Sequence, residues 1–129
     1  MSKRILMVDD EPDIIALTKI ILEKNGFEVS TASDGREGLQ RAAEEKPDLI
    51  ILDIRMPKIY GEEVASELNK DPETSEIPII FFTNSTTVSS LSAELEEIGI
   101  YRKGGNKAVL SKSCSNEDLL STISKLLEG

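Results

Sequence analysis

The stretch DLIILD, residues 48–53, indicates a strand that is buried on both of its faces. Its apolar residues run without interruption between two aspartates, whereas a strand with one face in water alternates apolar and polar residues. Similar unbroken runs occur at residues 4–8 and 77–83. Runs of this kind are typical of a parallel sheet covered by helices on both faces, so the rest of the chain should supply those helices.

Amphipathic segments do alternate with the apolar runs. Helical spacing of apolar residues occurs at 12–25, 34–46, 62–70, about 87–98 and 115–128, and further short strands are predicted at 27–32 and 108–111. Ser33 or Asp34 can cap the second of these helices, and Ser115 the last. The order predicts an α/β fold: a doubly wound, five-stranded parallel sheet with five helices.

The composition limits the classes of protein that the chain can belong to. Its 129 residues fit one domain, and no apolar run is long enough to span a membrane. The single cysteine rules out an internal disulfide, and the lack of histidine rules out histidine metal sites and triads. A net charge of −9 argues against nucleic acid and anionic membranes as partners. Because the first residues lack a signal-peptide pattern, we expect a cytoplasmic protein.

Polar side chains gather where the predicted strands end, which is the edge at which parallel α/β sheets bind ligands. They are Asp9, Asp10, Asp53, Thr83 and Lys112. Carboxylates in close contact raise one another's pKa unless a cation lies between them. Mg²⁺ prefers such oxygen ligands, so the sequence predicts a magnesium site at Asp9, Asp10 and Asp53. The alternative is that the acids at 9 and 10 only favour the N-terminus of the following helix.

A metal beside a hydroxyl and a lysine suggests phosphoryl transfer. The metal and Lys112 would neutralise phosphoryl oxygens, and Thr83 would donate a hydrogen bond to one of them. An aspartate can itself act as the nucleophile and form an aspartyl phosphate. Asp53 ends the central predicted strand and is therefore the best candidate for that role.

The motifs together resemble the receiver domain of two-component response regulators. They are VDDEP at 8–12, DLIILDIRMPKIYG at 48–61, Thr83 after PIIFF and Lys112 after AVLS. The resemblance covers residues 1–129 and implies a flavodoxin-like topology and a single receiver domain without an output domain. It implies a signalling switch that acts through a downstream protein, not an enzyme with a separate substrate. Whether phosphorylation makes the protein dimerise stays open.

The resemblance also implies roles for single residues. Asp53 would accept a phosphoryl group from the phosphohistidine of a sensor histidine kinase or a phosphotransfer protein. Asp10, with Asp9 acting through a water, would bind Mg²⁺ together with Asp53 and the main-chain carbonyl of Arg55. Lys112 would pair first with the acceptor and then with the phosphoryl group.

Two further implied roles concern movement and loop shape. Thr83 would be the switch hydroxyl that moves toward the phosphoryl group and carries the following loop with it. Pro57 and Gly61 would shape the loop behind the acceptor, which is also compatible with their being simple turn residues.

The sequence departs from the usual receiver pattern in four places. Ser113 follows Lys112 where a proline is usual, so either this peptide bond is trans and the lysine is aimed differently, or the fold forces a cis bond. Val109 replaces the switch aromatic. Asn84 replaces a small residue and could narrow access to the acceptor or bond the phosphoryl group. Thr83 and Lys112 are 29 residues apart, which is longer than expected.

Several other residues have open interpretations. Arg55 and Ser85 occupy positions that tune hydrolysis in this family, and Arg55 either pairs with the phosphoryl group or lies in solvent. Arg102 and Lys103, beside two glycines, form either a docking patch or a solvated loop. Cys114 is expected to be small and buried rather than reactive.

Two competing functions remain. A phosphorylation-independent binding module is favoured by the departures at Val109, Ser113 and Asn84, and is opposed by the complete set of strand-end residues. A Mg²⁺-dependent phosphatase would want an acid two residues after its nucleophile, where this chain has Arg55, so that function is disfavoured.

Overall fold

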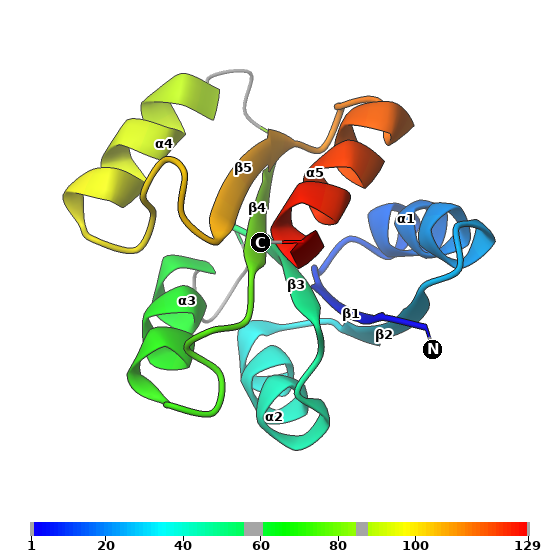
Figure 1. The fold of residues 1–129 in the computed structure, drawn as a ribbon, viewed down its shortest axis with the longest axis horizontal. Helices are drawn as coiled ribbons and strands as arrows, with labels where there is room; N and C mark the ends of the chain where they lie inside the picture. Colours follow the sequence, from blue (N-terminus) through cyan, green and yellow to red (C-terminus); the bar gives the residue numbers. More distant parts are fainter. Residues whose placement is uncertain (1, 56–60, 85–87, 129) are drawn as a thin grey trace.

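The apolar runs form one parallel sheet in the structure, a computed structural model that describes residues 2–55, 61–84 and 88–128. Within these residues the strand order is β2-β1-β3-β4-β5, and strands and helices alternate along the chain (Figure 1). The elements are β1 (Arg4–Val8), α1 (Pro12–Lys24), β2 (Glu28–Ala32), α2 (Gly35–Glu45), β3 (Leu49–Asp53), α3 (Gly61–Lys70), β4 (Ile79–Thr83), α4 (Val88–Glu97), β5 (Lys107–Ser111) and α5 (Asn116–Glu128). The predicted doubly wound α/β fold is confirmed.

The central strand β3 explains why its sequence does not alternate. Ile50 and Leu52 belong to a core shared with α2, α3 and α4, whereas Leu49 and Ile51 belong to a core shared with α1 and α5. The helices accordingly lie on the two sides of the sheet in Figure 1. All of these strand residues are almost completely buried, because both faces are covered.

The ends of the helices are set by the residues that the sequence suggested. The Asp34 side chain accepts a hydrogen bond from the Glu37 amide at 2.8 Å, and the Glu37 carboxylate accepts one from the Ser33 amide at 2.9 Å. Ser115 Oγ accepts the Asp118 amide at 3.0 Å in the same way at the start of α5. These side chains satisfy amides that have no partner within the helix.

Strand β4 starts two residues later than the apolar run predicts. The run begins at Ile77, but the strand begins at Ile79. Pro78 lies between them and has no amide hydrogen, so it can accept but not donate in the ladder. Its carbonyl accepts the Ile50 amide at 2.9 Å, while the Ile77 amide closes a turn onto the Thr74 carbonyl at 3.1 Å.

The strand register brings the predicted functional segments to one edge of the sheet. Val8 pairs with Leu52, and Thr83 pairs with Ser111. The Lys112 amide adds one more bond to this edge by donating to the Thr83 carbonyl at 2.7 Å. The side chains that follow β1, β3, β4 and β5 therefore emerge together. No helix in the described part of the chain is long and apolar enough to cross a membrane.

Candidate functional site

The ammonium group of Lys112 lies at the centre of the site. Its side chain is only 3 % exposed, and Nζ is 2.9 Å from Asp9 Oδ2, 2.5 Å from Glu11 Oε1 and 3.2 Å from Asp53 Oδ2. Burial alone would lower the pKa of Lys112, but the contacts with Glu11, Asp9 and Asp53 outweigh it and raise the pKa above its ordinary value. One positive charge thus faces three carboxylates, and the site keeps an excess of negative charge.

Asp53 is the buried carboxylate at the end of the central strand. Its Oδ1 atom accepts a hydrogen bond from the Arg55 amide at 3.1 Å, and its Oδ2 atom faces Lys112. Burial, helped by the charge of Asp9, raises the pKa of Asp53 to about 7, although the Arg55 amide and Lys112 act in the opposite direction. A cation bound at this point would favour the ionised form that a nucleophile needs.

The acids that follow β1 lie beside Asp53, as the strand-end argument predicts. Asp9 is buried and Asp10 is exposed; with Glu11 and Asp53 they offer carboxylate oxygens that all lie within 4.8 Å of one another. Asp9 Oδ1 accepts the Glu11 amide at 2.9 Å, but the buried Oδ2 has no hydrogen-bond partner and contacts Lys112 only as an ion pair. A hard divalent cation suits this set of oxygens, and the cluster could hold one.

Glu11 is the site residue that the sequence analysis did not assign. It occupies the N-cap position of α1, yet its side chain does not cap the helix. Its Oε1 atom instead accepts hydrogen bonds from Lys112 and from Asn84 Nδ2, the latter at 3.2 Å, and these bonds hold the pKa of Glu11 below its ordinary value. The only signal in the sequence was its place in an acidic triplet after a buried strand.

Asn84 therefore has a partner that neither of its predicted roles specified. It follows Thr83 at the end of β4 and reaches the loop between β1 and α1. Thr83 itself is buried beside Asp53, and its carbonyl accepts the Lys112 amide. The predicted tuning residue Ser85 and the predicted loop residue Pro57 lie outside the described residues.

The turn after β5 aims Lys112 without a proline. No cis peptide bond occurs among the described residues, so the Lys112–Ser113 bond is trans. Of the two alternatives left open by the sequence, the trans bond is the one found, and Lys112 Nζ still lies 3.2 Å from Asp53 Oδ2. Ser111 Oγ accepts the Ser113 amide at 3.1 Å and lies 2.8 Å from Ser113 Oγ, and the Ser111 carbonyl accepts the Cys114 amide at 3.0 Å. Serine hydrogen bonds fix this turn instead.

Gly61 packs directly against the backbone behind the acceptor. A Cβ atom at this position would lie 2.5 Å from the Asp53 carbonyl oxygen and 2.8 Å from Ile54 Cα, which no side chain can tolerate without a backbone shift. The Gly61 amide also donates to the Ile54 carbonyl at 3.0 Å. The close contact gives this glycine a role beyond that of a simple turn residue.

Two other predicted residues have plainer surroundings. The Arg55 side chain is exposed, and among the described residues no carboxylate oxygen lies within 4.0 Å of its guanidinium. Cys114 is half-buried against the core of α1 and α5, and burial raises the pKa of its thiol. The raised pKa disfavours the reactive thiolate, in agreement with a structural cysteine.

Comparison with known proteins identifies the class of protein. The family model for the response regulator receiver domain matches residues 5–124, and the chain belongs to that family. Receiver domains of this kind are phosphorylation-activated signalling switches in two-component systems, and this chain is one of them. The predicted resemblance is thereby confirmed.

Individual relatives cover nearly the whole chain. Protein PilH of Pseudomonas aeruginosa is 37% identical over 126 residues, which are 98% of this chain and 98% of PilH. The polar-differentiation response regulator DivK of Brucella anthropi is 33% identical over 127 residues, with the same coverage of 98% for both chains. The solved structure of the Vibrio cholerae chemotaxis protein CheY4 matches with a TM-score of 0.83 at 29% identity, covering 98% of this chain and 99% of CheY4.

Proposed function

We propose that Asp53 is the phosphoacceptor of this switch and that residues 1–129 form one receiver domain. The observation that carries the proposal is the buried Asp53 carboxylate, which lies at the carboxyl end of the central strand with Lys112 Nζ 3.2 Å from Oδ2. A carboxylate held in this way has one oxygen next to a fixed cation and a second oxygen on a backbone amide. The arrangement orients the nucleophile and supplies positive charge where phosphoryl oxygens arrive.

The proposed transfer uses the phosphohistidine of a sensor histidine kinase or a phosphotransfer protein as donor. A carboxylate oxygen of Asp53 attacks the phosphorus, the new P–O bond forms, and the P–N bond breaks with its electron pair leaving on the imidazole. Lys112 then exchanges the Asp53 oxygen for a phosphoryl oxygen, and the Thr83 hydroxyl donates to another. These two contacts distinguish the phosphorylated from the unphosphorylated state and bias the protein between two conformations.

The acidic cluster suits Mg²⁺ as the cofactor. Asp9, Asp10 and Asp53 supply the carboxylate oxygens, and the main-chain carbonyl of Arg55 is the proposed fourth protein ligand. The charge balance of the cluster supports this assignment, because the Lys112 ammonium faces three carboxylates, those of Asp9, Glu11 and Asp53, and a divalent cation would balance the remaining negative charge. When bound, the ion supplies positive charge that neutralises the carboxylates and the incoming phosphoryl oxygens.

Glu11 and Asn84 are proposed to tune the rate of phosphorylation. Glu11 competes with Asp53 and the phosphoryl group for Lys112, and Asn84 holds Glu11 in the competing position. The Asn84–Glu11 hydrogen bond joins the residue after Thr83 to the loop after β1. A movement of the segment around Thr83 must therefore either break this bond or move Glu11 with it. Arg55 and Ser85 are retained as proposed tuning positions for hydrolysis.

The partners follow from the function rather than from a contact in the structure. We propose that the protein is cytoplasmic, with a sensor histidine kinase or phosphotransfer protein upstream and a protein target downstream. A dimer that forms on phosphorylation is compatible with this role. The single-turnover chemistry on its own Asp53 makes the protein a switch rather than an enzyme that acts on a separate substrate.

A phosphorylation-independent binding module is the second candidate. The specific observation in its favour is that Glu11 already occupies Lys112 while Asn84 holds Glu11, so the site is internally paired without a phosphoryl group. Val109, half-buried in the core at the place of the usual aromatic, points the same way.

The deciding experiment is intact mass after incubation with acetyl phosphate, with and without Mg²⁺, on the parent chain and on Asp53→Asn. We expect a gain of one phosphoryl group that requires Mg²⁺ and is absent from Asp53→Asn. A folded parent chain that gains no mass would favour the binding module. A gain that persists in Asp53→Asn would contradict the assignment of the acceptor.

A further inference from the structure

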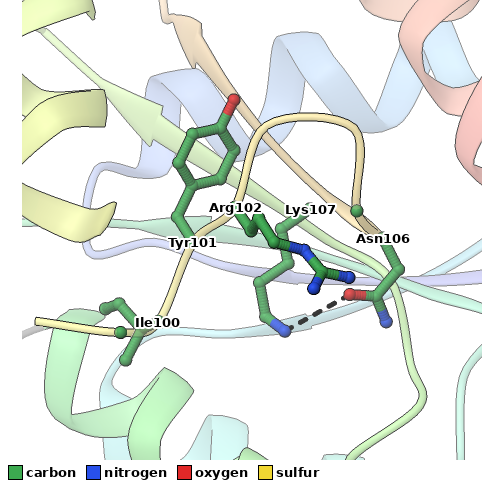
Figure 2. A pocket seen from close by; sticks show the side chains of 7 residues that line it. Ile100, Tyr101, Arg102, Asn106 and Lys107 are labelled. Atoms are coloured by element: carbon green, nitrogen blue, oxygen red, sulfur yellow. Dashed lines mark hydrogen bonds between the residues drawn. The ribbon is translucent and has the colours of Figure 1, made fainter. Parts of the chain in front are cut away.

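A second polar hollow lies at the opposite edge of the sheet from Asp53. The connection from α4 to β5, residues 98–106, borders an open surface hollow of about 270 Å³ at the point where β5 begins. The residues that line it are Gly99, Ile100, Tyr101, Arg102, Gly105, Asn106 and Lys107 (Figure 2). We call it the α4–β5 pocket. Among the described residues no carboxylate lines it, although the chain carries 24 acidic and only 15 basic residues.

Glycines give the pocket its shape. Gly99 and Gly104 have φ values of +83° and +82°, which residues with side chains rarely adopt, and they turn the chain at the two ends of the loop. The Gly105 amide donates to the Arg102 carbonyl at 3.0 Å. A Cβ atom at Gly105 would lie 3.1 Å from that carbonyl oxygen and 3.8 Å from Arg102 Nε. The absence of a side chain thus leaves room beside the guanidinium.

Asn106 fixes the floor of the pocket. Its carbonyl accepts the Ile79 amide at 3.3 Å, and its side-chain Nδ2 donates to the Glu76 carbonyl at 3.3 Å. Its Oδ1 atom accepts a hydrogen bond from Lys107 Nζ at 3.4 Å. In Figure 2 the head groups of Arg102 and Lys107 both extend toward Asn106, while the Tyr101 hydroxyl points away from them.

The two cations of the pocket lack a matching anion. In the described ranges, no carboxylate oxygen lies within 4.0 Å of Arg102 or Lys107. Burial lowers the pKa of Lys107, and the more distant charge of Glu76 opposes this only in part. The charged form of a half-buried lysine with one long hydrogen bond to an amide oxygen is poorly stabilised. An anion bound in the pocket would stabilise this charged form.

We propose that the α4–β5 pocket binds a phosphate-type oxyanion, either free or as the phosphate group of a small phosphomonoester. Arg102 presents a planar fork of donors that matches two phosphate oxygens, and Lys107 supplies a second positive charge. Two cations balance the two negative charges of a phosphate near neutral pH. The cavity is slightly smaller than ordinary ligand pockets of roughly 300–1,000 Å³, which fits a small phosphorylated molecule better than a nucleotide.

The test is an NMR titration of the ¹⁵N-labelled full chain in the Asp53→Asn background without Mg²⁺, which keeps phosphate from the acceptor site. The probes are inorganic phosphate and glycerol phosphate, with acetate as a singly charged control and sodium chloride at matched ionic strength. We expect saturable shifts of the amides in residues 98–107 with phosphate. Arg102→Gln should weaken binding by about tenfold, because it removes a charge-assisted fork. Tighter binding of glycerol phosphate than of phosphate would support an esterified ligand, and equal binding the free anion.

Lys103→Gln is the matched control, because Lys103 is an adjacent cation that is exposed like Arg102 but does not line the pocket. It removes the same charge and should change the affinity by less than about twofold. Equal weakening by Lys103→Gln and Arg102→Gln, shifts that do not saturate, or the same response to chloride or acetate would overturn the proposal. Lys107→Gln removes the second cation that lines the pocket and should also weaken the binding of phosphate. Failure here would leave the role of Asp53 untouched, since intact mass reports that role separately.

Discussion

The two ends of β5 place the same type of residue in opposite surroundings. Lys107 opens the strand and is half-buried, whereas Lys112 follows the strand and its side chain is almost completely buried. Lys112 meets three carboxylates, and its pKa rises above the ordinary value. Lys107 meets an amide oxygen, and its pKa falls. Burial alone favours a neutral lysine, and the acids at the carboxyl edge of the sheet reverse this effect at Lys112.

The largest effect on stability is expected from removing the ammonium group of Lys112, which follows β5. Lys112→Ala leaves Asp9, Glu11 and Asp53 facing one another without their shared cation, and we expect the free energy of unfolding to fall by about 3 kcal/mol. Urea denaturation with and without Mg²⁺ measures this. Because a divalent ion can replace the lost charge, Mg²⁺ should recover part of the stability in the variant and less in the parent chain. An unchanged stability would mean that water already screens these carboxylates.

The next largest effect is expected at Asn84, which bonds the Glu11 carboxylate that pairs with Lys112. Asn84→Ala removes the hydrogen bond that holds Glu11 against Lys112, so Lys112 becomes more available to a phosphoryl group. We expect phosphorylation by acetyl phosphate to be faster by about fivefold, which corresponds to one hydrogen bond of about 1 kcal/mol. Time-resolved intact mass gives the rate. Glu11→Gln keeps the shape but loses the charge and should accelerate the reaction in the same direction; a slower reaction in both variants would refute the tuning role.

The serine turn tests how Lys112 is aimed. Ser111→Ala removes the acceptor of the Ser113 amide and the contact between the two hydroxyls, and it should destabilise the protein by about 0.5–1 kcal/mol. Thermal unfolding checks this value. Ser121→Ala, an exposed serine of α5 that bonds only the Asp118 carbonyl, is the matched control and should cost less. Equal effects of the two substitutions would show that the turn after β5 does not depend on Ser111.

The smallest effect is expected at the Lys107 end, with the opposite sign. Lys107→Met removes a half-buried ammonium without an ion-pair partner, and we expect stability at pH 7 to stay level or rise by less than about 1 kcal/mol. The folded state holds the Lys107 proton less tightly than the unfolded chain does. The destabilisation is therefore complete below the folded pKa and disappears as the pH rises through the unfolded value, near 10.4 for lysine. Denaturation at pH 7 and at alkaline pH checks this. The parent chain should recover the stability that Lys107 costs it as the pH rises, and Lys107→Met should lack this contribution.

Much of the fold could be predicted because its signals are local or periodic. The unbroken run in β3 reports burial on both faces, and Asp34 and Ser115 mark helix starts by their own hydrogen bonds. The gathering of Asp9, Asp53 and Lys112 followed from a rule about parallel strands, which needs only the order of the elements.

The rest depends on partners that are distant in the sequence. Glu11 does not cap its own helix. Its carboxylate instead accepts a hydrogen bond from Lys112, which lies 101 residues further along the chain. Asn84 finds Glu11 across 73 residues. The sequence left the Lys112–Ser113 bond open between trans and cis, because the serine hydrogen bonds that form this turn could not be read from it. Periodicity carries no information about such contacts.

The Lys112 amide that donates to the Thr83 carbonyl at 2.7 Å has a mechanical meaning as well. Within the described residues it is the final hydrogen bond between β4 and the segment after β5, and the two residues that it joins are both proposed to contact the phosphoryl group through their side chains. Separating the strands there would cost about 1 kcal/mol for the lost bond. A conformational change that keeps this crosslink has to turn the two side chains about a common hinge, with the sheet behind them acting as a rigid support.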